Sequence, residues 1–247
     1  MIFKIQKILS KYGFNSRRNI EKMIYNKEIF INNQLIKIGD VFEEKDIKII
    51  QIKGVCFNTP LKFLNKMLIL NKKIGQICSK KTNENYNTIF DHLPVIKYGK
   101  WINIGRLDVN TEGLLLITTD GELAYRLAHP KYNIKRDYKV KVCGLLTTHL
   151  FKKLQKGLWY NKKFLIFNNI FFIKGDKFNK WFVVTLYQGR NREVRILWES
   201  IGLTVKKLIR ISYANIFLPK SLKKGKFTEL SKKKINKLRI LVNLAKI

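Results

Sequence analysis

The residues with the clearest chemical potential read Gly-Arg-Leu-Asp at 105–108, between apolar runs at 101–104 and 114–117. Turn-forming Asn, Thr and Gly residues follow at 110–113, so the pattern predicts one carboxylate, Asp108, on a turn between two strands. A carboxylate held there can act as a nucleophile if a positive partner is supplied. Taken alone, the segment is better explained as a hairpin turn that happens to contain an aspartate.

Two further segments supply partners of the required kind. Residues 135–142 alternate with a period of two, typical of a strand, and place Tyr138 on one face with two valines. Residues 189–195 lie between a predicted strand and a predicted helix, in a chain whose usual cation is Lys. An arginine cluster there indicates sites that need the planar guanidinium group. Its members are Arg190, Arg192 and Arg195. Considered singly, the tyrosine is more typical of a core and the arginines of a solvated loop.

The whole chain is strongly basic. Among its 247 residues, 50 are Lys or Arg and 17 are Asp or Glu, which gives a formal net charge of +33. Such an excess predicts a polyanionic partner, above all a nucleic acid. An AT-rich genome also favours Lys, Asn and Ile, so codon usage is a second explanation for part of the charge.

The cysteine, histidine and apolar patterns exclude several protein classes. The three cysteines lie far apart without a C-x-x-C motif, which indicates reduced thiols in a cytoplasmic protein rather than a disulfide framework. The three histidines lack metal-ligand spacing, so no metal site is expected. No apolar run approaches the length of a membrane span, and lysines interrupt the N-terminus too often for a signal peptide.

The pattern predicts two domains joined by a linker. Residues 1–54 predict a small module of two helices followed by strands, and 55–66, which contain Thr-Pro, predict the linker. Residues 67–247 predict a larger domain that ends in a basic helix. In the small module, Ser16 is expected to cap the second helix. The exposed face of that helix is expected to carry Arg17, Arg18 and Lys22.

The larger domain shows mainly strand patterns with a few helices. Strands are expected at 164–173 and 181–187, and helices at 122–127 and 147–155. A last helix is expected after Ser231, with one apolar face. That face comprises Ile235, Leu238, Leu241, Val242 and Ala245.

Together and in this order, the segments GRLD with TEGLLLITTDGEL, RDYKV and GRNREVR closely resemble the RsuA/RluB family of ribosomal RNA pseudouridine synthases. The resemblance covers nearly the whole chain, because the first 54 residues are similar to an S4 RNA-binding domain. Further matches are Asn71-Lys72 with Gly75, Thr88 to Asp91 with Leu93-Pro94, and His129-Pro130. Two positions depart from the family pattern: Lys73 stands where Pro is usual, and Ile196 stands where a second Arg is usual.

This resemblance implies an α+β fold: a small S4-type domain, then a catalytic domain built on a mixed, largely antiparallel sheet flanked by helices. It implies that Asp108 is the essential carboxylate, acting as a nucleophile or as a proton acceptor. Arg195 is then expected to pair with Asp108 and keep it ionised, and Tyr138 to stack on the target uracil. The residues expected to hold neighbouring phosphates or bases are Arg106, Arg190 and Arg192.

The implied reaction breaks the glycosidic N1–C1′ bond of uridine, turns the base and joins C5 to C1′. It is redox-neutral and hydrolyses nothing, so neither a cofactor nor a metal ion is expected. The implied partner is ribosomal RNA. The residues at 118–123 and 189–195 most closely resemble the large-subunit branch of the family, which favours the 23S molecule, either naked or in a ribosomal precursor particle. The enzyme is expected to be a cytoplasmic monomer that does not bind membranes.

Two other hypotheses were weighed against the enzyme. A non-catalytic ribosome-assembly factor that retains the fold would explain the charge and the S4-like module, but it leaves Asp108, Tyr138 and Arg195 without a purpose. A nuclease or other phosphoryl-transfer enzyme predicts clustered carboxylates that bind metal ions, and the sequence shows none near the arginine cluster.

Overall fold

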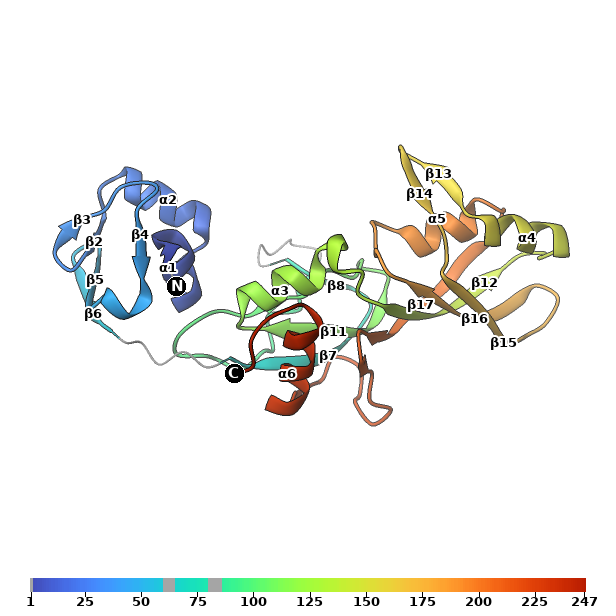
Figure 1. Cartoon of the computed structure of the whole chain (residues 1–247). Helices are drawn as coiled ribbons and strands as arrows, with labels where there is room; N and C mark the ends of the chain where they lie inside the picture. The colour runs from blue at the N-terminus through green and yellow to red at the C-terminus, as the bar shows by residue number, and fades with distance from the viewer. Residues whose placement is uncertain (1, 60–64, 80–85) are drawn as a thin grey trace. The chain divides into compact units, whose positions relative to one another are not determined.

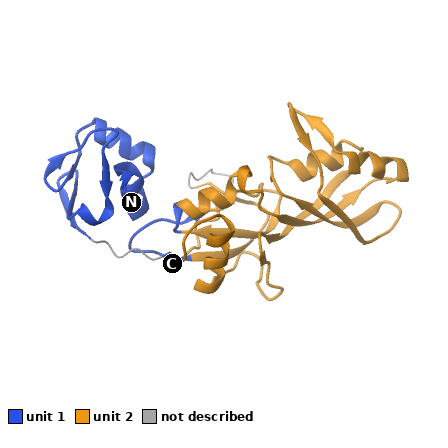
Figure 2. Cartoon of the chain, viewed as in Figure 1, with its two compact units in different colours: residues 1–66, 94–102, 119–121 blue, residues 67–93, 103–118, 122–247 orange. Residues whose placement is uncertain are grey.

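The computed structural model describes residues 2–59, 65–79 and 86–247, which form two compact units (Figures 1 and 2). The first unit comprises residues 1–66, 94–102 and 119–121. The second comprises residues 67–93, 103–118 and 122–247. The two short segments at 94–102 and 119–121 were not predicted to belong with the N-terminal module.

Two helices supply much of the core of the first unit. Helix α1 (Ile5–Tyr12) ends at Gly13, whose φ of +93° is the left-handed conformation that favours glycine. Helix α2 (Arg17–Tyr25) begins after Ser16, whose side chain accepts a hydrogen bond from the Asn19 amide at 3.2 Å. The predicted cap is therefore confirmed. The solvent-exposed residues of α2 include Arg17, Arg18 and Lys22.

Short strands complete the first unit. Strand β1 (Ile2–Lys4) pairs with β4 (Val41–Glu43), which is followed by the 3-10 turn η1 (Glu44–Asp46). A second sheet has the order β3 (Gln34–Leu35), β2 (Ile29–Ile31), β5 (Ile49–Ile52) and β6 (Val55–Asn58).

Strand β6 lies where the sequence predicted the start of the linker. Lys53 and Gly54 both have positive φ angles, 50° and 82°, so they form a tight two-residue turn that reverses the chain. Val55 then pairs with Ile52, and the antiparallel register continues to Asn58. The expectation of a linker over 55–66 is therefore wrong for 55–58. The expected break at Pro60 lies outside the described residues.

One large sheet dominates the second unit. Its order is β15 (Asn169–Gly175), β16 (Asn179–Leu186), β12 (Arg136–Cys143), β17 (Thr204–Tyr213), β11 (Glu112–Thr118), β7 (Met67–Lys72) and β19 (Phe227–Glu229). Neighbouring strands are antiparallel except β11 and β17, which run parallel. The predicted mixed, largely antiparallel sheet is confirmed. Short strands at its margins are β10 (Ile102–Asn103) and β18 (Ile216–Phe217).

Smaller elements accompany this sheet. Strands β8 (Gln76–Ile77) and β9 (Asn87–Thr88) form a parallel pair, and β13 (Leu158–Tyr160) and β14 (Lys163–Leu165) form a hairpin. The helices are α3 (Gly121–Ala128), α4 (Thr148–Lys156), α5 (Glu193–Glu199) and α6 (Lys232–Leu241), with a 3-10 turn, η2 (Pro130–Tyr132), after α3. The helices expected at 122–127 and 147–155 are confirmed.

Two sequence expectations for the second unit need correction. The single strand expected at 164–173 is two strands, because β14 pairs with β13 outside the main sheet whereas β15 joins the sheet edge. The apolar face of the last helix includes Ile235, Leu238 and Val242, but Leu241 and Ala245 are exposed. The helix ends at Leu241 and the chain turns at Asn243, whose φ is 57°.

The buried strands β7 and β11 form the centre of the second unit. Every residue of both strands is buried, as expected for strands covered on both faces. Next to them, Arg126 of α3 donates hydrogen bonds to the carbonyl oxygens of Val242 and Asn243 at 3.0 and 2.8 Å, which joins α3 to the end of α6.

A buried carboxylate joins three neighbouring strands of the sheet, β16, β12 and β17. Asp137 accepts hydrogen bonds from the hydroxyls of Thr185 and Ser212, both at 2.7 Å, and lies 3.2 Å from the Lys135 ammonium. Burial acts to raise the pKa of Asp137, but these three interactions outweigh it and hold the pKa below its ordinary value.

This arrangement predicts an acid-dependent loss of stability. The folded-state pKa of Asp137 is depressed, so its stabilisation is present above the ordinary Asp pKa of about 3.9 and is lost as the pH falls through the folded pKa. We expect Asp137→Asn to lower the free energy of unfolding by about 1–3 kcal/mol at pH 7. The difference from wild type should narrow below about pH 4 in urea titrations. A difference that is constant with pH would contradict this account.

Candidate active site

Asp108 lies on the loop between β10 and β11, as the sequence predicted. Its side chain is partly exposed, and its carbonyl oxygen accepts a hydrogen bond from the Thr111 amide at 3.0 Å, which closes a tight turn. At the start of the loop, the Asn103 side chain donates to the Gly105 carbonyl at 2.6 Å. The loop backbone is thus held on both sides of Asp108.

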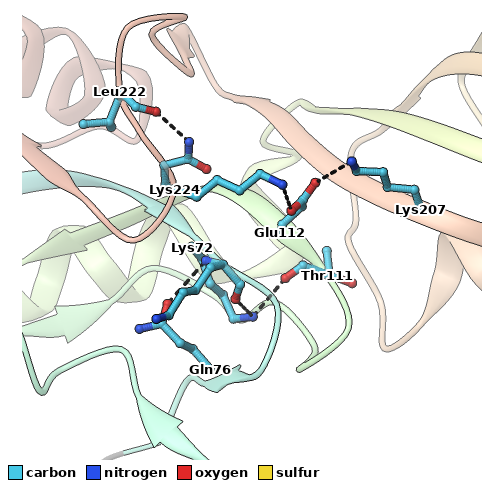
Figure 3. Close-up of polar contacts among 9 residues, drawn as sticks. Lys72, Gln76, Thr111, Glu112, Lys207, Leu222 and Lys224 are labelled. Carbon is cyan, nitrogen blue, oxygen red and sulfur yellow. Dashed lines mark hydrogen bonds and ion pairs between the residues drawn. The ribbon is translucent and has the colours of Figure 1, made fainter.

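A buried lysine stabilises this loop by hydrogen bonds to its backbone. Lys72, the last residue of β7, is 0% exposed. Its ammonium group donates to the carbonyl oxygen of Thr111 at 2.9 Å (Figure 3). It also donates to the carbonyl oxygens of Asp108 at 3.1 Å and Lys73 at 3.2 Å. Burial lowers the pKa of Lys72, and the negative charge of Asp108 is among the groups that oppose this shift. The lysine therefore fixes the backbone on which Asp108 stands.

A second buried charge anchors the other end of the turn. Glu112, the first residue of β11, is 2% exposed and lies 2.6 Å from the Lys224 ammonium and 3.5 Å from that of Lys207 (Figure 3). Nearby, the Asn71 side chain donates to the Leu222 carbonyl at 2.7 Å. These contacts connect β7, β11 and β17 with the segment that precedes β19.

Tyr138 is aligned with the Asp108 loop across three neighbouring strands. Arg210 of β17 lies opposite Gly113 of β11 on one side and opposite Tyr138 of β12 on the other. A Cβ atom on Gly113, whose φ is +105°, would overlap the Arg210 carbonyl, so only glycine permits this approach. Two strand spacings separate Gly113 from Tyr138, about 10 Å. Tyr138 itself is largely buried.

The Arg195 side chain contacts the backbone of the Asp108 loop. The guanidinium donates to the Asn110 carbonyl at 3.0 Å and to the Val205 carbonyl at 3.1 Å. Burial and the positive charge of Arg192 lower the pKa of Arg195, and the charge of Asp108 opposes the shift. Within the described residues no ion pair joins Asp108 to Arg195, so their direct pairing stays a prediction.

The start of the loop at 189–195, which carries the arginine cluster, packs against the buried side chain of Arg136. The sequence analysis gave Arg136 no role. Arg136 donates to the carbonyl oxygens of Tyr187 at 2.6 Å and Ile134 at 2.9 Å, and to the Tyr213 hydroxyl at 3.1 Å. Gly189 lies directly against it, since a Cβ there would be 2.9 Å from the Arg136 Nε atom. Further along, buried Glu193 accepts from the Arg190 amide at 2.8 Å, and burial raises the pKa of Glu193.

The residues predicted to hold RNA fall into two groups. Arg106, on the Asp108 loop, and Arg192, at the start of α5, are exposed, and Arg190 is partly exposed. Arg192 also lies 3.7 Å from the Glu199 carboxylate, a pairing that solvent weakens. The second group, on α2, belongs to the first unit: Arg17, Arg18 and Lys22.

Four buried charged residues support the site and were given no role from the sequence. They are Lys72, Glu112, Arg136 and Arg210. The available signal was position, since each lies within or at the end of a strand of the main sheet. Charged residues are almost never fully buried unless paired, so such a position indicates a specific set of partners.

The described residues place limits on other chemistry. None of their helices is long and apolar enough to cross a membrane. In that same part of the chain, no group of three or more His, Cys, Asp or Glu side chains is arranged to hold a metal ion.

Comparison with known proteins now decides the family. Residues 66–200, more than half of the chain, match the family model described as RNA pseudouridylate synthase. The chain belongs to this family. Among solved structures, one described as the crystal structure of pseudouridylate synthase has a TM-score of 0.64 and 25% identity, and the match covers 96% of this chain and 99% of that one.

Curated relatives of this pseudouridine synthase carry a more specific name. Ribosomal large subunit pseudouridine synthase B of Buchnera aphidicola subsp. Baizongia pistaciae is 44% identical over 246 residues, which are 99% of this chain and 100% of that protein. The protein of the same name from Escherichia coli strain K12 is 41% identical over 243 residues, 98% of this chain and 84% of that protein. The predicted family and the predicted enzyme class, an isomerase, are confirmed.

The role of Lys72 can be tested in this pseudouridine synthase. Lys72→Met keeps the length of the side chain but removes the charged donor to the backbone carbonyls of Lys73, Asp108 and Thr111. We expect a loss of about 1–3 kcal/mol in the free energy of unfolding. We also expect at least a 10-fold lower kcat for pseudouridine formation, on the order of the cost of misplacing a reacting group.

Lys73→Met is the matched control, because it removes the same charge from the next residue, whose side chain is exposed. It should unfold and react like the wild type. Equal effects of the two substitutions would mean that charge, rather than the buried contacts of Lys72, matters.

Proposed function

We propose that this chain converts a uridine of large-subunit ribosomal RNA to pseudouridine. The observation that carries the proposal is the GRLD loop itself: a single carboxylate, Asp108, held on a backbone that Lys72 and Arg195 fix by hydrogen bonds. The names of the curated relatives support the choice of large-subunit RNA. A 23S rRNA, either naked or in a precursor particle, is the proposed substrate of a cytoplasmic monomer.

In the proposed mechanism, Asp108 acts on the target uridine as a nucleophile or as a proton acceptor while the N1–C1′ bond breaks. The uracil turns within the site and its C5 joins C1′. The hydrogen on C5 leaves as a proton and N1 takes up a proton, so the ring of the base is retained. Arg195 is proposed to pair with the Asp108 carboxylate and so to stabilise its negative charge. Tyr138 would stack on the extruded uracil.

Arginines around the site would position the RNA. Arg106, Arg190 and Arg192 are proposed to hold phosphates or bases next to the target, since the guanidinium fork suits both. The cationic face of α2, in the first unit, is proposed to bind the RNA backbone. Such contacts orient the RNA without reading its sequence.

The second candidate is a ribosome-assembly factor that binds RNA without catalysis. The exposed cations of α2 and the overall charge of +33 fit that function equally well. It does not require the buried support under Asp108, because binding to phosphates needs no carboxylate. Measurement of catalysis separates the two candidates.

The decisive experiment measures release of tritium from C5-labelled uridine in unmodified 23S rRNA. The wild type should release tritium, and Asp108→Asn should lower the rate by at least 100-fold, on the order of the loss of an acid–base or nucleophilic group. Binding of the RNA by Asp108→Asn should remain. A wild type that binds rRNA but releases no tritium would support the assembly factor, and full activity of Asp108→Asn would refute the assignment of Asp108.

The role of α2 predicts a change in affinity alone. Replacing Arg17, Arg18 and Lys22 together with Ala should raise the KM for 23S rRNA and leave kcat at saturating RNA unchanged. The slope of log affinity against log salt should fall by about 2–3, one increment for each lost phosphate contact. Folding should be unaffected because all three side chains are exposed and two lie at the unfavourable N-terminus of the helix. An unchanged salt slope would argue against an RNA-binding face on α2.

A further inference from the structure

Two exposed aromatic rings stand side by side on the hairpin of β13 and β14, which the proposed function does not use. Trp159 is 73% exposed and Phe164 is 40% exposed. They lie directly opposite each other in the hairpin, with ring centroids 5.6 Å apart and ring planes tilted by 57°. The tilt means that the two rings do not stack on each other.

The outward direction of this pair follows from the hairpin's own geometry. Leu165 is 2% exposed, so the face that it shares with Leu158 packs inward and the next positions point to solvent. Asn161 and Lys162 both have positive φ angles, 48° and 60°, and form the tight turn. At the base, a Cβ on Gly157 would be 2.5 Å from the Leu165 carbonyl, so glycine allows the strands to approach.

A hydrogen bond joins this hairpin to the candidate active site. The Arg190 guanidinium donates to the backbone carbonyl of Phe164. Arg190 also begins the short segment that leads through Glu193 to Arg195, and Arg195 donates to the Asn110 carbonyl on the Asp108 loop. Figure 1 shows the hairpin projecting from the main sheet near α5, which carries Arg195.

The charge around the pair favours a polyanion. Residues 138–175 contain no Asp or Glu, and the hairpin carries Lys162 in its turn and Lys163 at the start of β14, both exposed. Aromatic rings beside cations, with no acidic residue along the same segment, are the usual composition of surfaces that bind single-stranded nucleic acid. An acidic peptide would meet the cations as well, but it would leave the flat faces of the aromatic rings without a matching partner.

We propose that Trp159 and Phe164 form a stacking platform for an unpaired base of the RNA that flanks the target uridine. Trp159 stacks on the base, Phe164 supports the tryptophan from the neighbouring strand, and Lys162 and Lys163 contact adjacent phosphates. The platform acts on binding and register of the RNA and takes no part in the chemical step. This inference rests on the proposed function, because it assumes that the chain binds ribosomal RNA.

The experiment compares Trp159→Ala with Trp159→Phe on in-vitro-transcribed 23S rRNA. Loss of a base–aromatic stack is expected to raise both the KM for pseudouridine formation and the Kd in filter binding at least 5-fold. The kcat at saturating RNA should stay within about 2-fold of wild type, since no reacting group is removed. Trp159→Phe keeps an aromatic face and should restore most of the affinity. Thermal unfolding should not change for either variant, because the side chain is exposed.

Phe171→Ala is the matched control. Phe171 is another exposed aromatic residue, at 60%, on the edge strand β15, and it makes no described contact with the loop at 189–195. Normal affinity of this control with weakened affinity of Trp159→Ala supports the platform. Equal losses in both variants would overturn it, because the effect would then come from general apolar contact. A Trp159→Ala variant that binds 23S rRNA like the wild type would also overturn it.

The two proposals fail in different ways. If the wild type binds 23S rRNA but forms no pseudouridine, the proposed function fails, and filter binding still tests the platform. If the wild type is active and Trp159→Ala is indistinguishable from it, the platform alone fails. A concentration-dependent dimer that dissociates in Trp159→Ala, seen by sedimentation, would assign the surface to a second copy of the chain and overturn the RNA proposal.

Discussion

The position of the candidate catalytic carboxylate depends on one buried ammonium group. A charged group that is removed from water must find partners inside the protein, and Lys72 finds them in the carbonyl oxygens of residues 73, 108 and 111. The dependence is mutual, because the same hydrogen bonds hold the backbone in place at residues 73, 108 and 111. The end of β7 therefore determines the path of the loop, and the loop determines where Asp108 stands.

The parallel pairing of β11 with β17 extends this constraint to the rest of the site. It places Arg210 between Gly113, five residues after Asp108, and Tyr138 on the next strand. Arg210 is itself buried and donates to the Leu114 carbonyl at 2.7 Å, so its register relative to β11 is fixed by a charge-assisted hydrogen bond. Tyr138 and the strand that follows the Asp108 loop thus belong to one sheet, although 30 residues of sequence separate Asp108 from Tyr138.

The sequence predicted best what short-range patterns encode. The strand around Tyr138, the Ser16 cap and the helix after Asp120 follow from periodicity and capping chemistry. Strand β6 was missed because the Lys53-Gly54 turn has a lysine where a hairpin turn usually has Asn or Asp. The buried charges were missed for another reason: a lysine or arginine appears exposed in sequence until its long-range partners are known. Only the resemblance to a family, and no spacing rule, brought Asp108, Tyr138 and Arg195 together.

The total charge does not show which cations have a specific role in the structure. The location of the arginines does. Arg136, Arg195 and Arg210 are buried, and the guanidinium groups of the first two each satisfy two separate backbone carbonyls. A lysine offers a single nitrogen at the end of a flexible chain and could not reach both carbonyls with the same geometry. Lys72 is the one buried lysine among the described residues, and its carbonyl partners converge on one point. The many exposed lysines fit general attraction to a polyanion, whereas the buried arginines serve positions where geometry, and not charge alone, decides the residue.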